Sequence, residues 1–120
     1  MWKILVAEDD SASRELLAEI FQRGGCQVVE ACDGREALQK AEEIHPDLVL
    51  LDLQMPRLDG FTVLRQLRQN PCLAALPVLA LTAYAMQGDR EKVLAAGFDG
   101  YIAKPIDAAA LKTQIEQFLD

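Results

Sequence analysis

Short apolar runs alternate with amphipathic stretches along the whole chain. The runs that predict strands occupy residues 3–7, 26–31, 47–51, 77–81 and 100–103. Apolar side chains recur at helical spacing over residues 11–23, from Gly34 to about 44, between Gly60 and Asn70, and over 86–96 and 107–119. Regular alternation of strands and helices predicts βα units with right-handed crossovers. We therefore expect one α/β domain with a five-stranded parallel sheet and helices on both faces.

The apolar signal differs in strength among the predicted strands. Residues 3–7 and 47–51 are nearly uninterrupted apolar runs, as expected of strands that are buried on both faces. Residues 26–31 and 100–103 are weaker and suit the edges of a sheet. These differences predict the strand order 2-1-3-4-5, with a topological switch point between the first and third strands.

Polar residues follow several of the apolar runs directly. They are Glu8, Asp9 and Asp10, then Asp52, Thr82 and Lys104. Because the carboxyl ends of parallel strands meet at one edge of a sheet, we expect these side chains to converge in one crevice. Clustered carboxylates repel one another unless a cation neutralises them, and their hard oxygen ligands suit Mg²⁺. The lysine and the hydroxyl group suggest that a phosphoryl group also binds in the crevice.

Composition narrows the class of protein. The 120 residues, 51% of them hydrophobic, predict a single domain over residues 1–120 without linkers or repeats. The net charge of -7 and the scattered cations argue against nucleic-acid binding. No apolar stretch reaches the roughly 20 residues of a membrane span, and Met1 almost adjoins the first strand, so we expect a cytoplasmic protein without a signal peptide.

Cys26, Cys32 and Cys72 lack metal or disulfide spacing and are expected to be small buried side chains.

Other α/β chemistries can be tested against the same residues. The first strand is followed by EDDSAS rather than the glycine-rich loop of dinucleotide-binding folds, and no P-loop sequence is present. A phosphatase of the haloacid dehalogenase type would carry a second aspartate two residues after its nucleophile. Gln54 stands at that position after Asp52. Such a phosphatase remains the enzymatic alternative, although a leaving group would lack its proton donor.

Four motifs together carry a resemblance to a known family. KILVAEDDSASR, DLVLLDLQMPRLDG, LTA and YIAKP resemble, in this order and spacing, the receiver domain of two-component response regulators. The resemblance covers essentially the whole chain and implies a flavodoxin-like receiver fold. It also implies a phosphoacceptor that takes its phosphoryl group from a histidine kinase or a phosphotransfer protein. Such a protein is not an enzyme in the usual sense, although it assists its own phosphorylation and dephosphorylation.

The resemblance assigns a metal-binding role to the acidic residues. It makes Asp52 the phosphoacceptor and places Asp9 and Asp52 directly on Mg²⁺, for which Mn²⁺ could substitute. The backbone carbonyl of Gln54 would add a further oxygen, and Glu8 would act mainly through bound water. Asp10 lies one position beyond the acidic pair of the family. We therefore expect it to cap the first helix.

Further positions would assist the chemistry or transmit its result. Lys104 would pair with a phosphoryl oxygen or, before phosphorylation, with Asp52, and the family commonly has a cis bond before the following Pro105. Thr82 and Tyr101 would form the switch: the hydroxyl turns toward the phosphoryl group and the aromatic ring moves inward. The ordinary alternative for Tyr101 is an edge-strand aromatic side chain.

Two positions would tune loss of the phosphoryl group. In the family, the residues that flank the line of water attack correspond to Gln54 and Tyr84, and neither is an acid here. A carboxylate could orient the hydrolytic water, whereas the ring of Tyr84 would cover the phosphoryl group. We therefore expect a comparatively long-lived aspartyl phosphate.

The expected partners are proteins. A downstream target would bind the face formed by the helix over 86–96, the strand over 100–103 and the last helix, and nucleic acid and membrane are not expected partners. The chain would be a monomer or a weak, phosphorylation-dependent dimer. Its start close to the first strand fits a separate single-domain regulator, while a receiver excised from a hybrid histidine kinase would have the same sequence features.

Overall fold

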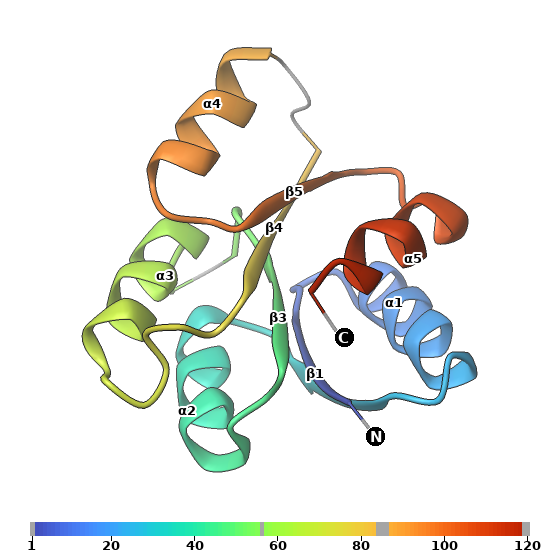
Figure 1. Ribbon diagram of the computed structural model, residues 1–120, viewed down its shortest axis with the longest axis horizontal. Coiled ribbons are helices and arrows are strands. Elements are labelled where there is room, and N and C mark those ends of the chain that lie inside the picture. The colour runs from blue at the N-terminus through green and yellow to red at the C-terminus, as the bar shows by residue number, and fades with distance from the viewer. Residues whose placement is uncertain (1, 56, 84–86, 119–120) are drawn as a thin grey trace.

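The computed structural model describes residues 2–55, 57–83 and 87–118 and contains the expected alternation of strands and helices (Figure 1). In chain order the elements are β1 (Lys3–Ala7), α1 (Ser11–Arg23), β2 (Gln27–Ala31), α2 (Gly34–Ile44), β3 (Leu48–Asp52), α3 (Gly60–Gln69), β4 (Val78–Thr82), α4 (Gln87–Ala95), β5 (Gly100–Ala103) and α5 (Ala108–Glu116). Among the described residues, no helix is both long and apolar enough to cross a membrane.

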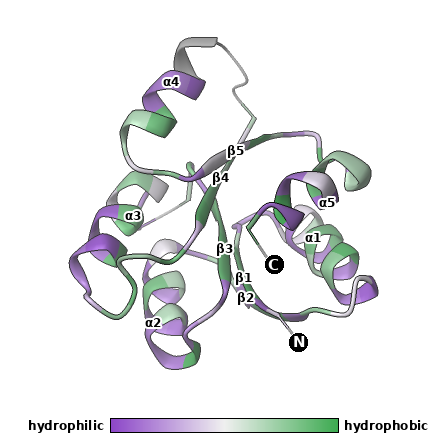
Figure 2. Ribbon diagram, viewed as in Figure 1, coloured by the Kyte–Doolittle hydropathy of each residue, from purple (hydrophilic) through white to green (hydrophobic). Residues whose placement is uncertain are grey.

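The strands form one parallel sheet in the order β2-β1-β3-β4-β5, which confirms the predicted topology. Helices α1 and α5 lie on one side of the sheet, and α2, α3 and α4 lie on the other (Figure 1). Every residue of β3 and β4 is buried, and these central strands are among the most hydrophobic parts of the ribbon (Figure 2). Burial on both faces explains why their sequences lack the alternation of a half-exposed strand.

The alternation of side chains along each strand divides the core into two layers. Residues of β1 such as Ile4 and Val6 pack with Leu17 of α1 and Leu111 of α5. The intervening residues, for example Leu5, pack toward α2, α3 and α4. Because successive strand residues point to opposite faces, a residue's position along its strand decides which layer it joins.

The third and fourth strands each begin and end one residue later than predicted. Asp52 pairs in register with Leu81, and Thr82 pairs with Ala103. The Lys104 N–H donates to the Thr82 carbonyl at 2.8 Å, so the sheet pairing continues to the end of β4. Asp52 and Thr82, which were predicted to follow strands, are thus the last residues of β3 and β4.

Aspartates begin four of the helices. The side chains of Asp10, Asp33, Asp59 and Asp107 each accept a hydrogen bond from a backbone N–H in the first turn of a helix. Such caps typically stabilise a helix by about 1 kcal/mol. The cap that was predicted for Asp10 is therefore present.

The expectation that all three cysteines are buried was wrong. Cys26 is partly buried, whereas Cys32 and Cys72 are exposed, and all three are free thiols. Cys32 lies beyond the end of β2, and the Cys72 N–H donates to the side chain of Asn70 in the turn after α3. Both exposed cysteines lie in connections, which run over the surface of a domain.

Candidate functional site

Three of the predicted site residues project from the carboxyl edge of the sheet toward the same side. Glu8 follows β1, Asp52 ends β3 and Lys104 follows β5. Each stands two positions after a core side chain on the face that α1 and α5 cover, namely Val6, Leu50 and Ile102. Because side chains alternate with a period of two, the sequence positions bring these three polar groups to one face.

A lysine lies between two buried carboxylates. The Nζ atom of Lys104 is 3.1 Å from Oδ2 of Asp52 and also forms an ion pair with Oε1 of Glu8. The Glu8 side chain is fully buried, that of Asp52 is 6% exposed and that of Lys104 is 21% exposed. The expected contact between Lys104 and Asp52 is therefore present. The contact with Glu8 was not foreseen, although the shared strand alternation could have indicated it.

The acidic residues approach one another closely enough to share a cation. Glu8, Asp9 and Asp52 each offer a carboxylate oxygen, and these oxygens lie within 4.8 Å of one another. Asp10 is not part of this group, because its Oδ2 accepts hydrogen bonds from the backbone N–H and the hydroxyl of Ser13. With all four groups ionised, three carboxylates and the Lys104 ammonium would carry two net negative charges, which matches a divalent cation.

Burial shifts the protonation equilibria of the site. Removal from water, followed by the proximity of Asp52, raises the pKa of Glu8 to about 8 in the absence of a metal ion. Burial alone would lower the pKa of Lys104, but Glu8 and Asp52 favour its charged form and raise the pKa above its usual value. Hydrogen bonds from the hydroxyl and the backbone of Ser13 lower the pKa of Asp10. The raised pKa of Glu8 means that a metal ion near this side chain would favour loss of its proton.

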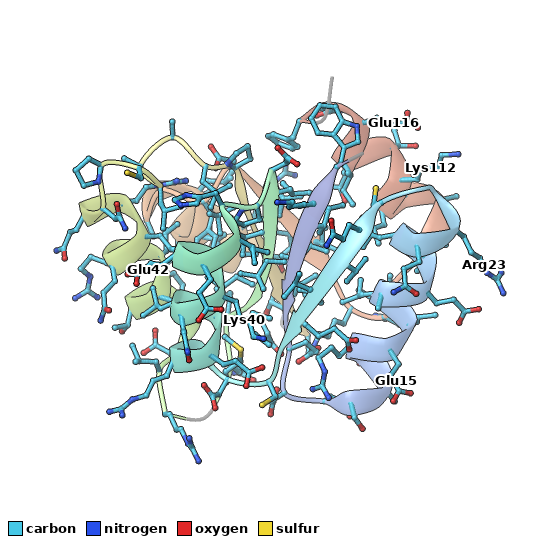
Figure 3. All side chains as sticks on the ribbon, turned by 90° about the horizontal axis from the view of Figure 1, so that it is seen from below. Glu15, Arg23, Lys40, Glu42, Lys112 and Glu116 are labelled. Atoms are coloured by element: carbon cyan, nitrogen blue, oxygen red, sulfur yellow. The ribbon has the colours of Figure 1, made fainter. Side chains whose placement is uncertain are left out.

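The stability of the metal-free protein is expected to fall as the pH rises, partly because of Glu8. The folded state favours protonated Glu8, so this contribution is fully present below about pH 4.5 and is lost as the pH rises toward about 8. Glu8→Gln retains a neutral side chain and should flatten the decrease. Thermal unfolding in a chelator between pH 5 and 8 measures this difference. Glu15→Gln, at an exposed position on α1, is the control, and equal slopes for wild type and Glu8→Gln would contradict the prediction (Figure 3).

The turn after β3 holds Oδ1 of Asp52, the carboxylate oxygen that does not face Lys104. The Gln54 N–H donates to Oδ1 of Asp52 at 2.9 Å, while Oδ2 faces Lys104. The Gly60 N–H donates to the Leu53 carbonyl, and a Cβ atom at Gly60 would lie only 2.7 Å from the Asp52 carbonyl oxygen. Gly60 thus allows α3 to begin against the turn, a close approach that the local sequence pattern does not predict.

The two switch candidates lie on the opposite face of the sheet from Lys104. Thr82 is buried at the end of β4. Tyr101 of β5 pairs with Ala80, two positions before Thr82, and its half-buried ring packs against the core beneath α2, α3 and α4. Thr82 and Tyr101 therefore belong to neighbouring strands and point to the same side of the sheet.

The remaining predictions concern a backbone bond and two tuning residues. The Lys104–Pro105 peptide bond is cis, as the family resemblance implied. Gln54 is exposed, its N–H donates to Asp52, and its tuning role stays a prediction. Tyr84 lies outside the described residues, so its predicted role stays a prediction.

The sequence of this chain is similar to the sequences of a known protein family. The sequence profile of the response regulator receiver domain matches residues 4–116. The chain is 34% identical to the polar-differentiation response regulator DivK of Brucella ovis over 116 residues, which cover 97% of this chain and 94% of that protein.

Solved structures show the same architecture. The receiver domain of the sensor histidine kinase PA1611 from Pseudomonas aeruginosa superposes with a TM-score of 0.91 at 34% identity, covering 98% of this chain and 97% of that one. That crystal structure contains a magnesium ion coordinated in its active-site cleft. The chemotaxis protein CheY4 of Vibrio cholerae gives a TM-score of 0.92 at 29% identity, with 98% of both chains covered.

Proposed function

This chain belongs to the response regulator receiver domain family, and from that premise we propose that Asp52 is the side chain that accepts the phosphoryl group. A receiver of this family is a phosphoacceptor in two-component signalling. The observation that carries the assignment is the position of Asp52, buried at the end of β3, 3.1 Å from the Lys104 ammonium and beside two further carboxylates. The Lys104 ammonium lies where it could later contact a phosphoryl oxygen on Asp52, and the carboxylate of Asp52 is the nucleophile.

The donor set fits Mg²⁺. The ligands available are oxygens, the cluster carries excess negative charge, and apart from its ion pair Oε1 of Glu8 has no hydrogen-bond partner among the described residues. Asp9, Asp52 and the carbonyl of Gln54 would hold the ion, and Glu8 would act through water. When bound, the ion supplies positive charge that neutralises the carboxylates and the phosphoryl oxygens.

The chain's own residues would carry the transfer. A carboxylate oxygen of Asp52 attacks the phosphorus of a phosphohistidine, forming a P–O bond as the P–N bond of the donor breaks, and the imidazole leaves. Lys104 then exchanges its contact with Asp52 for one with a phosphoryl oxygen. The hydroxyl of Thr82 donates a hydrogen bond to another phosphoryl oxygen, and Tyr101 moves inward on the same face of the sheet.

The output would be contact with another protein. Tyr101 borders a cavity of about 330 Å³ with residues of α4 and α5, among them Leu94 and Gln114, so its movement would alter this surface. We assign the donor role to a histidine kinase or phosphotransfer protein and the downstream binding to the face of α4, β5 and α5. We further infer that residues 1–120 act as one receiver domain in the cytoplasm, as a monomer or a weak phosphorylation-dependent dimer.

The decisive experiment uses the wild-type protein with Mg²⁺ and acetyl phosphate. Intact-mass analysis should show the addition of one phosphoryl group, stable to acid and labile to hydroxylamine, as expected of an aspartyl phosphate. Continuous turnover of small phosphomonoesters would instead favour the haloacid dehalogenase alternative. A receiver excised from a hybrid kinase would give the same mass result, and the full open reading frame would identify it.

Dephosphorylation is expected to be slow in the wild type because neither Gln54 nor Tyr84 offers a carboxylate to orient water. Tyr84→Ala should lose phosphate faster by admitting water, and Tyr84→Glu should lose it fastest by positioning water as well. Phosphate release after removal of the donor measures the rates, with Tyr84→Phe as a control that retains the ring. Equal rates in all the variants would show that residue 84 does not shield the phosphoryl group.

A further inference from the structure

Arg14 connects the acidic loop to two neighbouring elements. It lies in the first turn of α1, and its side chain is only 20% exposed. Its Nη1 donates to the Glu8 carbonyl at 2.8 Å and approaches the Asp9 carbonyl at 3.5 Å. Its Nε donates to Oε1 of Glu30 on β2 at 3.3 Å. One guanidinium group therefore ties together the β1–α1 loop, helix α1 and the neighbouring edge strand.

These contacts hold the backbone of the residues that carry the acidic side chains. The Glu8 N–H donates to the Ala31 carbonyl at 3.0 Å, and the Glu8 carbonyl accepts a hydrogen bond from Arg14. The backbone N–H and the carbonyl of Glu8 are thus both hydrogen-bonded. They hold the backbone from which the Glu8 side chain reaches Lys104. A guanidinium group can form these bonds at once because its donors are arranged in a rigid fork, whereas a lysine offers only a point-like ammonium group.

The charge of Arg14 would by itself oppose the binding of a cation nearby. Two positive charges repel, so an arginine that acted only through its charge would weaken the binding of Mg²⁺ to the acidic cluster. An arginine that orders the loop would strengthen it, because ligands held in place lose less conformational freedom on binding. The two roles therefore predict opposite effects on metal affinity when the side chain is removed.

We propose that Arg14 is a positioning residue that orders the Glu8–Asp9 loop for divalent-cation binding through its bonds to the loop carbonyls and to Glu30. The proposal rests on the assignment of the acidic cluster to Mg²⁺ binding. It adds to that function a residue that touches neither the metal nor the phosphoryl group. Partners that orient metal ligands in this way commonly change metal affinity by about tenfold or more.

The test compares the Mg²⁺ dissociation constants of variants by calorimetry. Arg14→Lys and Arg14→Gln should both bind Mg²⁺ about tenfold more weakly than the wild type. Arg23→Gln removes the same charge from the opposite end of α1, where Arg23 pairs with Glu19 on the surface, and should leave the affinity unchanged (Figure 3). Tighter binding by Arg14→Gln together with wild-type binding by Arg14→Lys would show a pure charge effect and overturn the proposal.

A kinetic measurement distinguishes a positioning role of Arg14 from a general disruption of the site. In phosphorylation by acetyl phosphate, the Mg²⁺ concentration for half-maximal rate should rise in both Arg14 variants, while the rate at saturating Mg²⁺ stays near that of the wild type. An unchanged Mg²⁺ concentration for half-maximal rate would refute the positioning role. A large fall in the rate at saturating Mg²⁺ would refute it as well. If the wild type itself bound no Mg²⁺, the proposed function would fail instead, which is a distinguishable result.

Glu30→Gln provides a milder variant in case the Arg14 substitutions prevent folding. It retains the arginine and its bond to the Glu8 carbonyl but removes the ionic partner that orients the guanidinium group. We expect an increase of a few fold in the Mg²⁺ dissociation constant, at an unchanged unfolding temperature of the metal-free protein. An affinity equal to that of the wild type or tighter would contradict the proposal.

Discussion

The Asp52→Asn variant is expected to take up no phosphoryl group from acetyl phosphate, whereas the wild type takes up one. An amide oxygen is a far weaker nucleophile than a carboxylate, and the substitution also removes a charge from the proposed metal site. The shape of the side chain is almost unchanged, so the Gln54 N–H can still donate to the remaining oxygen. Intact-mass analysis over time, in the presence of Mg²⁺, measures the difference.

The matched control for this experiment is Asp59→Asn. Asp59 follows the same strand, and its Oδ1 caps α3 by accepting the Thr62 N–H at 2.9 Å. Asparagine is an equally good cap, so this variant should be phosphorylated at the wild-type rate. Phosphorylation of Asp52→Asn with the stoichiometry and rate of the wild type would show that the nucleophile is misassigned.

The Asp9→Asn variant is expected to bind Mg²⁺ about thirtyfold more weakly than the wild type. In water, unit charges about 4 Å apart attract by about 1 kcal/mol, and a divalent ion doubles this value, so the loss of one carboxylate charge removes about 2 kcal/mol. Calorimetric titration of the metal-free protein with Mg²⁺ measures the change directly.

Asp10→Asn is the comparison that makes this prediction specific. The two residues are adjacent, and both substitutions remove one negative charge, but only Asp9 contributes an oxygen to the cluster. Asp10 uses its carboxylate to cap α1 through Ser13, a task that asparagine also performs. We expect a small loss of affinity for Asp10→Asn, and equal losses in the two variants would contradict the assignment of Asp9 as the metal ligand.

The fold could be predicted from the sequence because its determinants are local. Strand and helix positions follow from the periodicity of apolar residues, and the order of the strands follows from how continuously apolar each run is. The cap at Asp10 depends only on residues within one turn of helix. The convergence of Glu8, Asp52 and Lys104 also follows from sequence, since parallel strands end at one edge.

The detailed site depended on tertiary structure. Which carboxylates Lys104 contacts depends on strand register and side-chain direction, and the raised pKa of Glu8 depends on burial that no local pattern reports. The reach of Arg14 to Glu30 follows from how α1 packs beside β2. Periodicity along the chain reports which side of an element is apolar, so it determined the fold and the edge on which the site lies. Contacts between remote side chains arise only when the elements pack, because packing sets the distances and excludes the water on which charge interactions depend.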